Sequence, residues 1–252
     1  FISGVVDFQD LPLNVSRELL QEHKVIERAK TALTKKAIAH LEELAGKYPE
    51  KYLNFWKNFG QIFKMFPAED PHMKDSIVPL LRFPSTHGSA IEFTSLTEYV
   101  ARMPEEQKEI YYITASNWDA AINSPHMDYF KKKGWEVLLL IDRVDESLMN
   151  YLQKFDSKEL RSITSADLPA LQETSEAEKE TSLSYQDLCA SLKMALIGKV
   201  KDVKVSSRLV DAPCCLVVDN ALSLHMQRLL KEAGQELDET LPILEINPEH
   251  PM

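Results

Sequence analysis

The chain has 252 residues, of which 44% are hydrophobic and 27% are charged, and its formal net charge is -10. This length can fill more than one hydrophobic core, and the composition excludes a disordered protein. The acidic balance argues against nucleic acid and acidic membranes as partners, because both need a basic footprint that neutralises phosphates. The longest aliphatic runs, VLLLI and CCLVV, have the length of buried strands and cannot cross a bilayer.

The cysteines and the first residues indicate the cellular compartment. Cys189, Cys214 and Cys215 make an odd count, and the adjacent pair stands in an apolar run, so we expect buried free thiols in a reducing environment. The opening FISGVVDF has neither the basic region nor the small-residue cleavage site of a signal peptide. We therefore predict a soluble, cytoplasmic protein that makes no contact with a membrane.

The chain begins with a predicted strand and turn, followed by a helical bundle segment. Apolar residues recur at three- and four-residue steps from Ile26 to Leu44, which indicates an amphipathic helix ending near Gly46. Pro49 opens a second helix. Its aromatic residues follow one face, as is typical of a helix–helix core, and are Tyr52, Phe55, Trp56, Phe59 and Phe63.

After residue 82 the pattern changes to strands that alternate with helices. The predicted strands are IYYIT, WEVLLLID and ELRSI, and a helix capped by Ser95 precedes them. Further helices are predicted over residues 118–122, 127–133 and 145–155. Such alternation predicts a small, largely parallel sheet whose faces are covered by helices.

A second, smaller α/β domain is predicted after a segment rich in Pro, Ser, Glu and Thr, which is typical of a linker. The expected elements are helices over 185–197 and 222–233 and strands over 200–206, 214–219 and 242–247. The predicted fold class is therefore mixed α/β (α+β), with a helical bundle segment, a small α/β sandwich and a second small α/β domain.

Sequence motifs for several common chemistries are missing. The glycines stand too far apart to form a phosphate-binding loop, the histidines lack the spacing of a metal site, and there is no nucleophile elbow. We expect no metal and no nucleotide to bind the chain by itself. The residues alone leave two interpretations, a two-module protein-interaction fragment or a small-molecule enzyme that uses the carboxyl ends of the α/β strands.

The stretch DLPLNVSRELLQ holds a candidate anion site. If Ser16 caps a helix, Arg17 and Gln21 lie one turn apart on the same face. One interpretation is an anion-binding pair for a phosphate. The other is a solvated arginine at a helix end, where the helix dipole mildly disfavours a cation.

Several segments, taken in order, resemble the heat-shock protein 90 chaperone family, and most closely its bacterial branch. They span nearly the whole chain and read FISGVVDFQDLPLNVSRELLQ, FWKNFG, LLRFPST, SLTEYVARM, IYYITA, SPHMDYFKKKGWEVLLLIDRVDE, VKDVKVSSRLVDAPCCLVVD and LEINPEH. The family protomer has an N-terminal ATP-binding domain, a middle domain and a C-terminal dimerisation domain. This resemblance implies the latter part of the middle domain and the start of the C-terminal one.

The resemblance also implies a division of the chain. Residues 1–81 would end the large middle-domain module and carry the catalytic loop and helical bundle, and residues 82–166 would form the small α/β module. Residues 167–182 would be the linker, and residues 183–252 a C-terminal domain truncated before its dimerisation helices. We expect ATP with magnesium and a homodimer in the full-length ATPase, whereas this fragment alone should be monomeric, bind no cofactor and hydrolyse no ATP.

By resemblance, the catalytic contribution comes from Arg17, which would reach the ATP bound on the N-terminal domain. Gln21 would assist it one turn later, and Asn14 in the same loop would be a third polar contact. The expected function is therefore to supply a catalytic arginine to a nucleotide held elsewhere in an ATP-dependent molecular chaperone.

Client binding is the second expected activity, with unfolded or partly folded proteins as partners. By resemblance it uses Glu146 and the apolar face of the predicted helix 222–233, formed by Leu222, Met226, Leu229 and Leu230. A Met-containing face adapts to many partners, although the same stripe also fits ordinary core packing. Ser147 stands where the bacterial pattern often has a tryptophan, which departs from the family at this contact.

Overall fold

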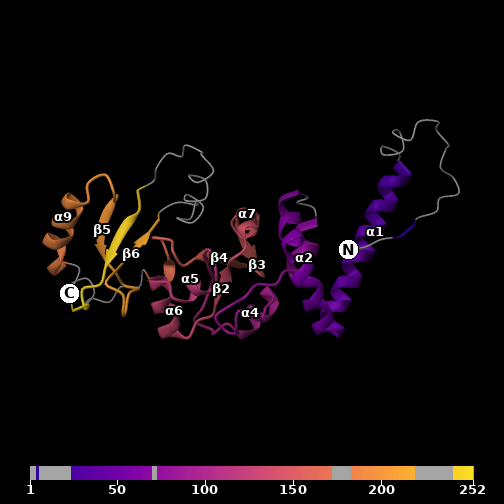
Figure 1. Cartoon of the computed structure of the whole chain (residues 1–252), viewed down its shortest axis with the longest axis horizontal. Coiled ribbons are helices and arrows are strands. Elements are labelled where there is room, and N and C mark those ends of the chain that lie inside the picture. Colours follow the sequence, from indigo (N-terminus) through magenta and orange to yellow (C-terminus); the bar gives the residue numbers. More distant parts are fainter. Residues whose placement is uncertain (1–3, 6–23, 70–72, 172–182, 219–240, 252) are drawn as a thin grey trace. The chain divides into compact units, whose positions relative to one another are not determined.

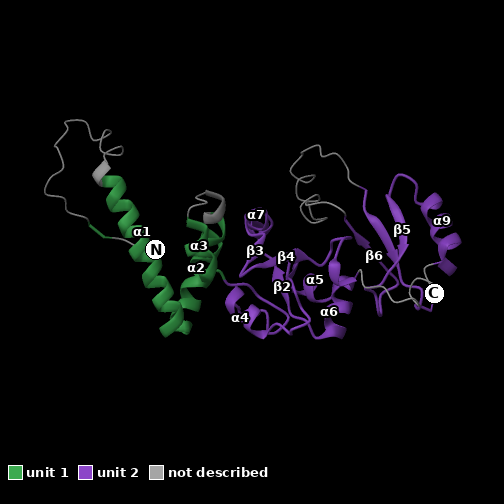
Figure 2. Cartoon of the chain, turned by 180° about the vertical axis from the view of Figure 1, so that it is seen from behind, with its two compact units in different colours: residues 1–81 green, residues 82–252 purple. Residues whose placement is uncertain are grey.

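The computed structural model describes residues 4–5, 24–69, 73–171, 183–218 and 241–251. The chain divides into two compact units, Phe1–Leu81 and Arg82–Met252 (Figures 1 and 2). The predicted opening strand and the predicted helix over 222–233 lie outside the described residues.

The first unit is helical. Its elements are α1 (Lys24–Lys47), α2 (Pro49–Glu69), α3 (Lys74–Ile77) and the short 3-10 helix η3 (Val78–Leu80). Both helices expected from the apolar periodicity are confirmed. The aromatic stripe of α2 forms core as predicted, since Tyr52, Trp56 and Phe63 are at most 4% exposed. The Tyr52 hydroxyl also donates a hydrogen bond to the carbonyl of Leu80, which ties α2 to η3.

Gly60 lies in α2 where the ring of Trp56 packs against its backbone, because a Cβ added there would meet Trp56 Cε2 at 2.6 Å. Alanine normally stabilises a helix by about 1 kcal/mol relative to glycine. We nevertheless expect Gly60→Ala to lower the melting temperature, because displacing a buried side chain costs about 1–3 kcal/mol. Thermal unfolding followed by circular dichroism measures the change.

Gly46 is the matched control for this prediction. It lies in α1, and a Cβ added there meets no atom within 4 Å. Gly46→Ala should therefore keep or raise the melting temperature. Equal stabilisation by both substitutions would show that the Trp56 ring does not restrict position 60.

The second unit begins with a four-stranded sheet in the order β2-β1-β4-β3. Its strands are β1 (Ile110–Thr114), β2 (Val137–Leu140), β3 (Lys154–Phe155) and β4 (Lys158–Ser162). Strand β1 is parallel to both β2 and β4, and only β3 is antiparallel to its neighbour. The prediction of a small, largely parallel sheet is therefore confirmed.

Helices surround this sheet, and they include the four predicted ones. They are α4 (Leu96–Arg102), α5 (Trp118–Ile122), η4 (Pro125–Met127), α6 (Asp128–Lys133), α7 (Arg143–Tyr151) and η5 (Pro169–Leu171). Alternate residues of β1, Tyr111 and Ile113, pack into one core with Ala121 of α5 and Phe130 of α6. The predicted cap of α4 is confirmed, since Ser95 and Glu98 form a capping box.

The helix predicted over residues 145–155 is wrong at both ends. Helix α7 begins at Arg143, because Asp142 caps it, and ends at Tyr151. Residues Lys154–Phe155 are instead strand β3, which turns back into β4 through Asp156 and Ser157 at φ 46° and 62°. Two successive positive φ angles match the twist of a tight hairpin, and Asp is among the few residues that tolerate them. The Asp-Ser pair is a weaker turn signal than Asn-Gly.

A three-stranded sheet follows in the same unit, in the order β5-β7-β6. Its elements are α9 (Gln186–Ala195), β5 (Asp202–Val205), β6 (Cys214–Val217) and β7 (Ile243–Ile246). They confirm the predicted helix over 185–197 and the three predicted strands. None of the described helices combines the length and the apolar character that a bilayer span would need.

The prediction of buried thiols is wrong for Cys214, which is exposed, and for Cys189, which is half-buried. Successive side chains of a strand point to opposite faces, so β6 can bury only one of Cys214 and Cys215. Cys215 is buried, and this burial raises the pKa of its thiol to about 12. Its thiol is therefore held in the neutral form near neutral pH.

The first residues of the predicted linker are packed against the α/β module. Leu168 is fully buried, and the Tyr129 hydroxyl donates a 2.9 Å hydrogen bond to the carbonyl of Ala170. Composition did not reveal this, because the Leu-Pro-Ala-Leu segment is too short to show a period. Residues 172–182 lie outside the described part of the chain.

Candidate functional site

Most of the predicted site residues lie outside the described residues. These are Asn14, Arg17 and Gln21 in the proposed catalytic loop and Leu222, Met226, Leu229 and Leu230 in the proposed client helix. The structure therefore brings none of them together and separates none of them. Of the predicted site residues, Glu146 is the one that the structure describes.

Glu146 lies in the first turn of α7, where a carboxylate also suits the helix dipole. It is half-buried and close enough to Tyr112 of β1 to act on its ionisation. Burial and then the negative charge of Glu146 raise the pKa of Tyr112 to about 12, so the phenol stays protonated. Buried Leu148 anchors α7, while Tyr151 at its end is 41% exposed. Helix α7 thus carries a half-buried carboxylate and an accessible aromatic ring, and the exposed ring can contact a polypeptide.

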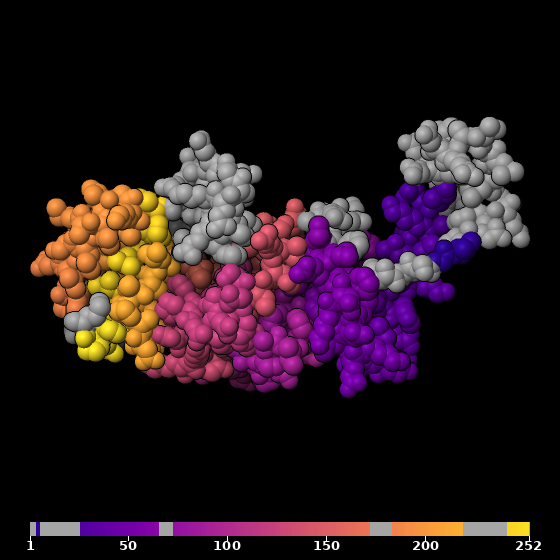
Figure 3. Space-filling view, viewed as in Figure 1, coloured from indigo at the N-terminus to yellow at the C-terminus, as the bar shows by residue number. Residues whose placement is uncertain are grey.

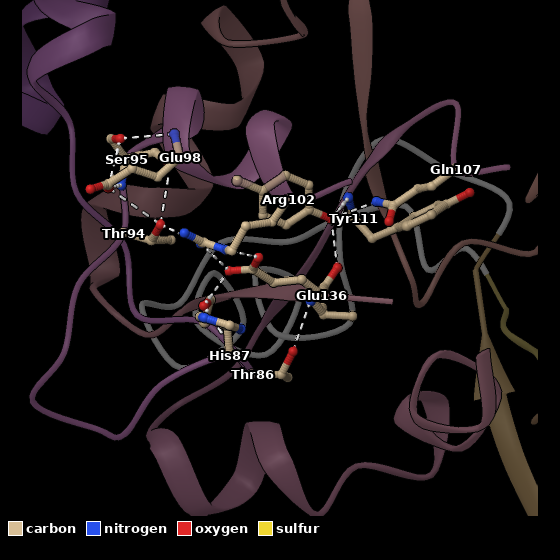
Figure 4. Close-up of polar contacts among 12 residues, drawn as sticks. Thr86, His87, Thr94, Ser95, Glu98, Arg102, Gln107, Tyr111 and Glu136 are labelled. Atoms are coloured by element: carbon tan, nitrogen blue, oxygen red, sulfur yellow. Dashed lines mark hydrogen bonds and ion pairs between the residues drawn. The ribbon is translucent and has the colours of Figure 1, made fainter. Parts of the chain in front are cut away.

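A polar network joins the start of β2 to α4 (Figure 4). The Arg102 guanidinium donates to both carboxylate oxygens of Glu136, at 2.8 Å and 3.0 Å, and to the Thr94 hydroxyl at 2.6 Å. The Ser85 hydroxyl donates to the same carboxylate at 2.6 Å. The hydrogen bonds that Arg102 donates to Glu136 raise the pKa of Arg102 further. This bidentate pair is a positioning contact, because its donors and acceptors are engaged with one another.

Tyr99 extends the network into the core. Its hydroxyl donates to the Glu136 carbonyl and accepts hydrogen bonds from the Gln107 side chain at 2.9 Å and the Tyr111 amide at 3.0 Å. Burial raises the pKa of Tyr99 far above its usual value, so the phenol remains a donor. Within the described ranges, no group of three His, Cys, Asp or Glu side chains is arranged to hold a metal ion. The hydrogen bonds of Tyr99 and Arg102 thus hold α4, β1 and β2 together.

A second polar cluster lies where the two sheets of the second unit meet. Arg208, in the turn between β5 and β6, is 1% exposed, and its guanidinium pairs with Glu245 of β7. His126 of η4 is also buried, and desolvation followed by the charge of Arg208 lowers its pKa to about 4. Its imidazole interacts with the carbonyl of Leu216 on β6.

No sequence motif marks these three residues. Arg208 follows two serines in a segment that reads as an ordinary surface turn, and Glu245 and His126 show no motif. The only available signal is a charged residue, Glu245, inside an otherwise apolar strand. That pattern indicates a buried partner without saying which cation provides it.

The family of the chain is shown by its similarity to known proteins. The family model described as Hsp90 protein matches residues 1–252. The chaperone protein HtpG of Shewanella loihica is 46% identical over 258 residues, an alignment that covers 100% of this chain and 40% of the relative. The chaperone protein HtpG of Burkholderia lata is 49% identical over 261 residues, covering 99% of this chain and 41% of the relative. The chain thus spans about two fifths of the length of these curated relatives.

Proposed function

Because the chain belongs to the Hsp90 protein family, we propose that it is part of an ATP-dependent molecular chaperone that binds unfolded or partly folded client proteins. The observation that carries this proposal is the family match over residues 1–252, together with two relatives that are named chaperones and share 46% and 49% identity. The ATPase activity belongs to the longer parent protein.

The proposed catalytic part is the loop that contains Arg17. In the parent protein, Arg17 would reach the terminal phosphate of magnesium ATP held on the N-terminal domain, with Gln21 and Asn14 as further polar contacts. A planar guanidinium suits this role, because phosphoryl transfer spreads negative charge over several phosphate oxygens. Since the arginine comes from a different domain, turnover would depend on domain docking. The isolated chain would neither bind nor hydrolyse ATP.

The proposed client surface combines α7 with the predicted helix over residues 222–233. On α7, half-buried Glu146 and exposed Tyr151 offer one carboxylate and one aromatic ring to a polypeptide. Leu222, Met226, Leu229 and Leu230 would add an apolar face. We further propose a cytoplasmic location and a homodimer for the parent protein, and a monomer for this acidic chain, whose like charges repel.

A binding titration tests the proposed function. The 252-residue chain should bind a fluorescently labelled, chemically unfolded polypeptide and should not bind labelled ATP. In addition, changing Leu222 and Met226 together to Ser should weaken polypeptide binding roughly tenfold or more, because each buried apolar side chain is worth about 1.5–3 kcal/mol. Fluorescence anisotropy measures the affinity.

The matched control is a second leucine and methionine pair on a described helix. Leu188 and Met194 of α9 are 46% and 78% exposed, and changing both to Ser should leave polypeptide affinity unchanged. Melting temperatures complete the comparison. A steep fall for the Leu222 and Met226 variant would assign those side chains to the core instead of the client surface.

A further inference from the structure

Arg208 is a buried charge at the meeting point of two sheets. Its side chain is 1% exposed and ranks among the largest fully buried side chains of the described residues. A buried guanidinium is costly unless it is paired and its hydrogen-bond donors are satisfied. Arg208 therefore needs fixed partners, and their positions along the chain are informative.

The partners of Arg208 come from the segment that follows the first sheet and from the second sheet. Its Nη1 donates to the Ile163 carbonyl at 2.7 Å, and its Nη2 donates to the Ser165 carbonyl at 2.9 Å. Both carbonyls belong to the segment that directly follows β4 of the first sheet. On the other side, Nη2 and Nε lie 3.1 Å and 2.9 Å from the two carboxylate oxygens of Glu245, on β7 of the second sheet.

The second sheet holds this arginine and its carboxylate in place. The Ser206 hydroxyl donates a 2.9 Å hydrogen bond to the Glu245 carboxylate. The Ser206 hydroxyl oxygen also accepts hydrogen bonds from the amides of Arg208 and Leu209, at 3.1 Å and 3.2 Å. One serine thus orients both the carboxylate and the turn that carries the arginine. These bonds orient the guanidinium toward the carbonyls of Ile163 and Ser165, in the segment that follows β4.

Among the described residues, further polar contacts join the two parts, whose atoms touch in the space-filling view (Figure 3), and one of them is the contact of the His126 imidazole with the Leu216 carbonyl. The amide of Ala166 donates to the Val218 carbonyl at 3.0 Å, and the amide of Val218 donates to the Thr164 carbonyl at 3.3 Å. Asp128 accepts from the amides of Val210 and Asp211, both at 3.3 Å. Within the described part of the chain, the local apolar cluster has Cys215, Val217 and Ile243 as buried members, with Ala166 and Leu209 beside them.

We propose that Arg208, with Glu245 and the carbonyls of Ile163 and Ser165, forms an orientation lock between the two sheets of the second unit. Apolar packing holds the two sheets together but does not fix their relative orientation, because the hydrophobic effect is non-directional. The planar guanidinium of Arg208 is hydrogen-bonded on both sides, so it fixes the orientation of the sheets as well as the distance between them. The consequence is that residues 82–171 and the sheet of β5, β6 and β7 move as one body. Without the Arg208 guanidinium, these two parts would change their relative orientation more easily.

Native-state hydrogen exchange on the whole chain tests this lock. In Arg208→Met, the amides of Ala166 and Val218, which bond across the junction, should exchange on the order of a hundredfold faster, because breaking a buried pair costs several kcal/mol. The amide of Leu139, bonded to Pro84 within the first module, should keep its rate. The amide of Lys201, which donates to the Pro242 carbonyl within the part that contains β5, β6 and β7, should also keep its exchange rate.

The Lys201 amide separates a lock from ordinary core packing. If it accelerates together with Ala166 and Val218, the second sheet has unfolded, Arg208 is a core residue and the proposal is overturned. Unchanged exchange at Ala166 and Val218 overturns it as well. Arg208→Lys, which keeps the charge but not the fork, should give an intermediate acceleration that is confined to the junction amides.

Two further variants complete the design. Arg208→Met combined with Glu245→Met removes the unpaired carboxylate, and the junction amides should still exchange fast, because the carbonyls of Ile163 and Ser165 remain without their donor. Recovery of slow exchange would assign the defect to the buried carboxylate and would refute the lock. Lys193→Met is the matched control, since it removes an ion pair with Asp202 that is largely exposed, and it should change none of these rates.

Discussion

In the full-length parent protein, Arg17→Ala is expected to lower ATP turnover roughly ten- to a hundredfold, below the thousandfold or more of arginine fingers elsewhere. The effect should be smaller than in those enzymes because domain closure, rather than chemistry, can limit the rate and hide part of a catalytic defect. ATP affinity should change little, since the proposed nucleotide pocket lies on another domain. Steady-state ATPase assays and a nucleotide titration measure the two quantities.

Two substitutions sharpen this prediction. Arg17→Lys should restore turnover only in part, because a point charge cannot reproduce the planar fork. Arg28, an exposed arginine of α1, provides the matched control, and Arg28→Ala should leave turnover unchanged. Circular dichroism confirms that each variant is folded. An Arg17→Ala protein that is folded and hydrolyses ATP at the normal rate would make Arg17 a solvated helix-end residue.

The second large effect concerns pH and His126. Burial, followed by the charge of Arg208, lowers the pKa of His126 from 6.5 to about 4 in the folded protein, while Asp128 and the Leu216 carbonyl oppose the shift only partly. Between these two values the unfolded chain binds a proton that the folded chain does not. The free energy of unfolding should therefore fall as the pH drops from 6.5 to 4. Because one pKa unit is worth about 1.4 kcal/mol, the loss from this residue is about 3 kcal/mol.

Urea unfolding at a series of pH values measures this dependence. His126→Gln keeps a donor that can face the Leu216 carbonyl but cannot be protonated, so its stability should decline much less over the same interval. His40 is exposed on α1, and His40→Gln should retain the pH dependence of the parent chain. Parallel pH profiles for the parent chain and His126→Gln would mean that His126 is not protected from protonation.

The sequence predicted elements whose signal is local. The apolar period of α1 and the aromatic face of α2 follow from spacing alone, because a helix places residues three and four apart on one side. The Ser95 cap of α4 and the apolar strands β1 and β2 are equally local, since a capping box and a buried strand are complete within a few residues. The segments that resemble the heat-shock protein 90 family in the same chain order also indicated the family, and the family match over residues 1–252 confirmed it.

The candidate site was predicted from the sequence and remains a proposal. Arg17 and Gln21 drew attention because they share a predicted helix face, and their role came from the family resemblance, not from any geometry. Glu146 is the predicted site residue that the structure places, half-buried on α7 beside Tyr112. The sequence could not have paired these two, because Glu146 and Tyr112 are far apart along the chain.

Only the tertiary structure decided the features that depend on distant partners. It exposed Cys214 while burying Cys215 among residues of other elements. It also put Arg208 against the carbonyl of Ile163, 45 positions earlier in the chain. Local pattern fixes which face of an element is apolar. It does not fix which polar group from elsewhere will satisfy a buried charge, because that depends on how separate elements pack. For this chain, the sequence by itself determined most of the helices and strands and the family, and packing decided that Arg208 is a buried contact between two sheets.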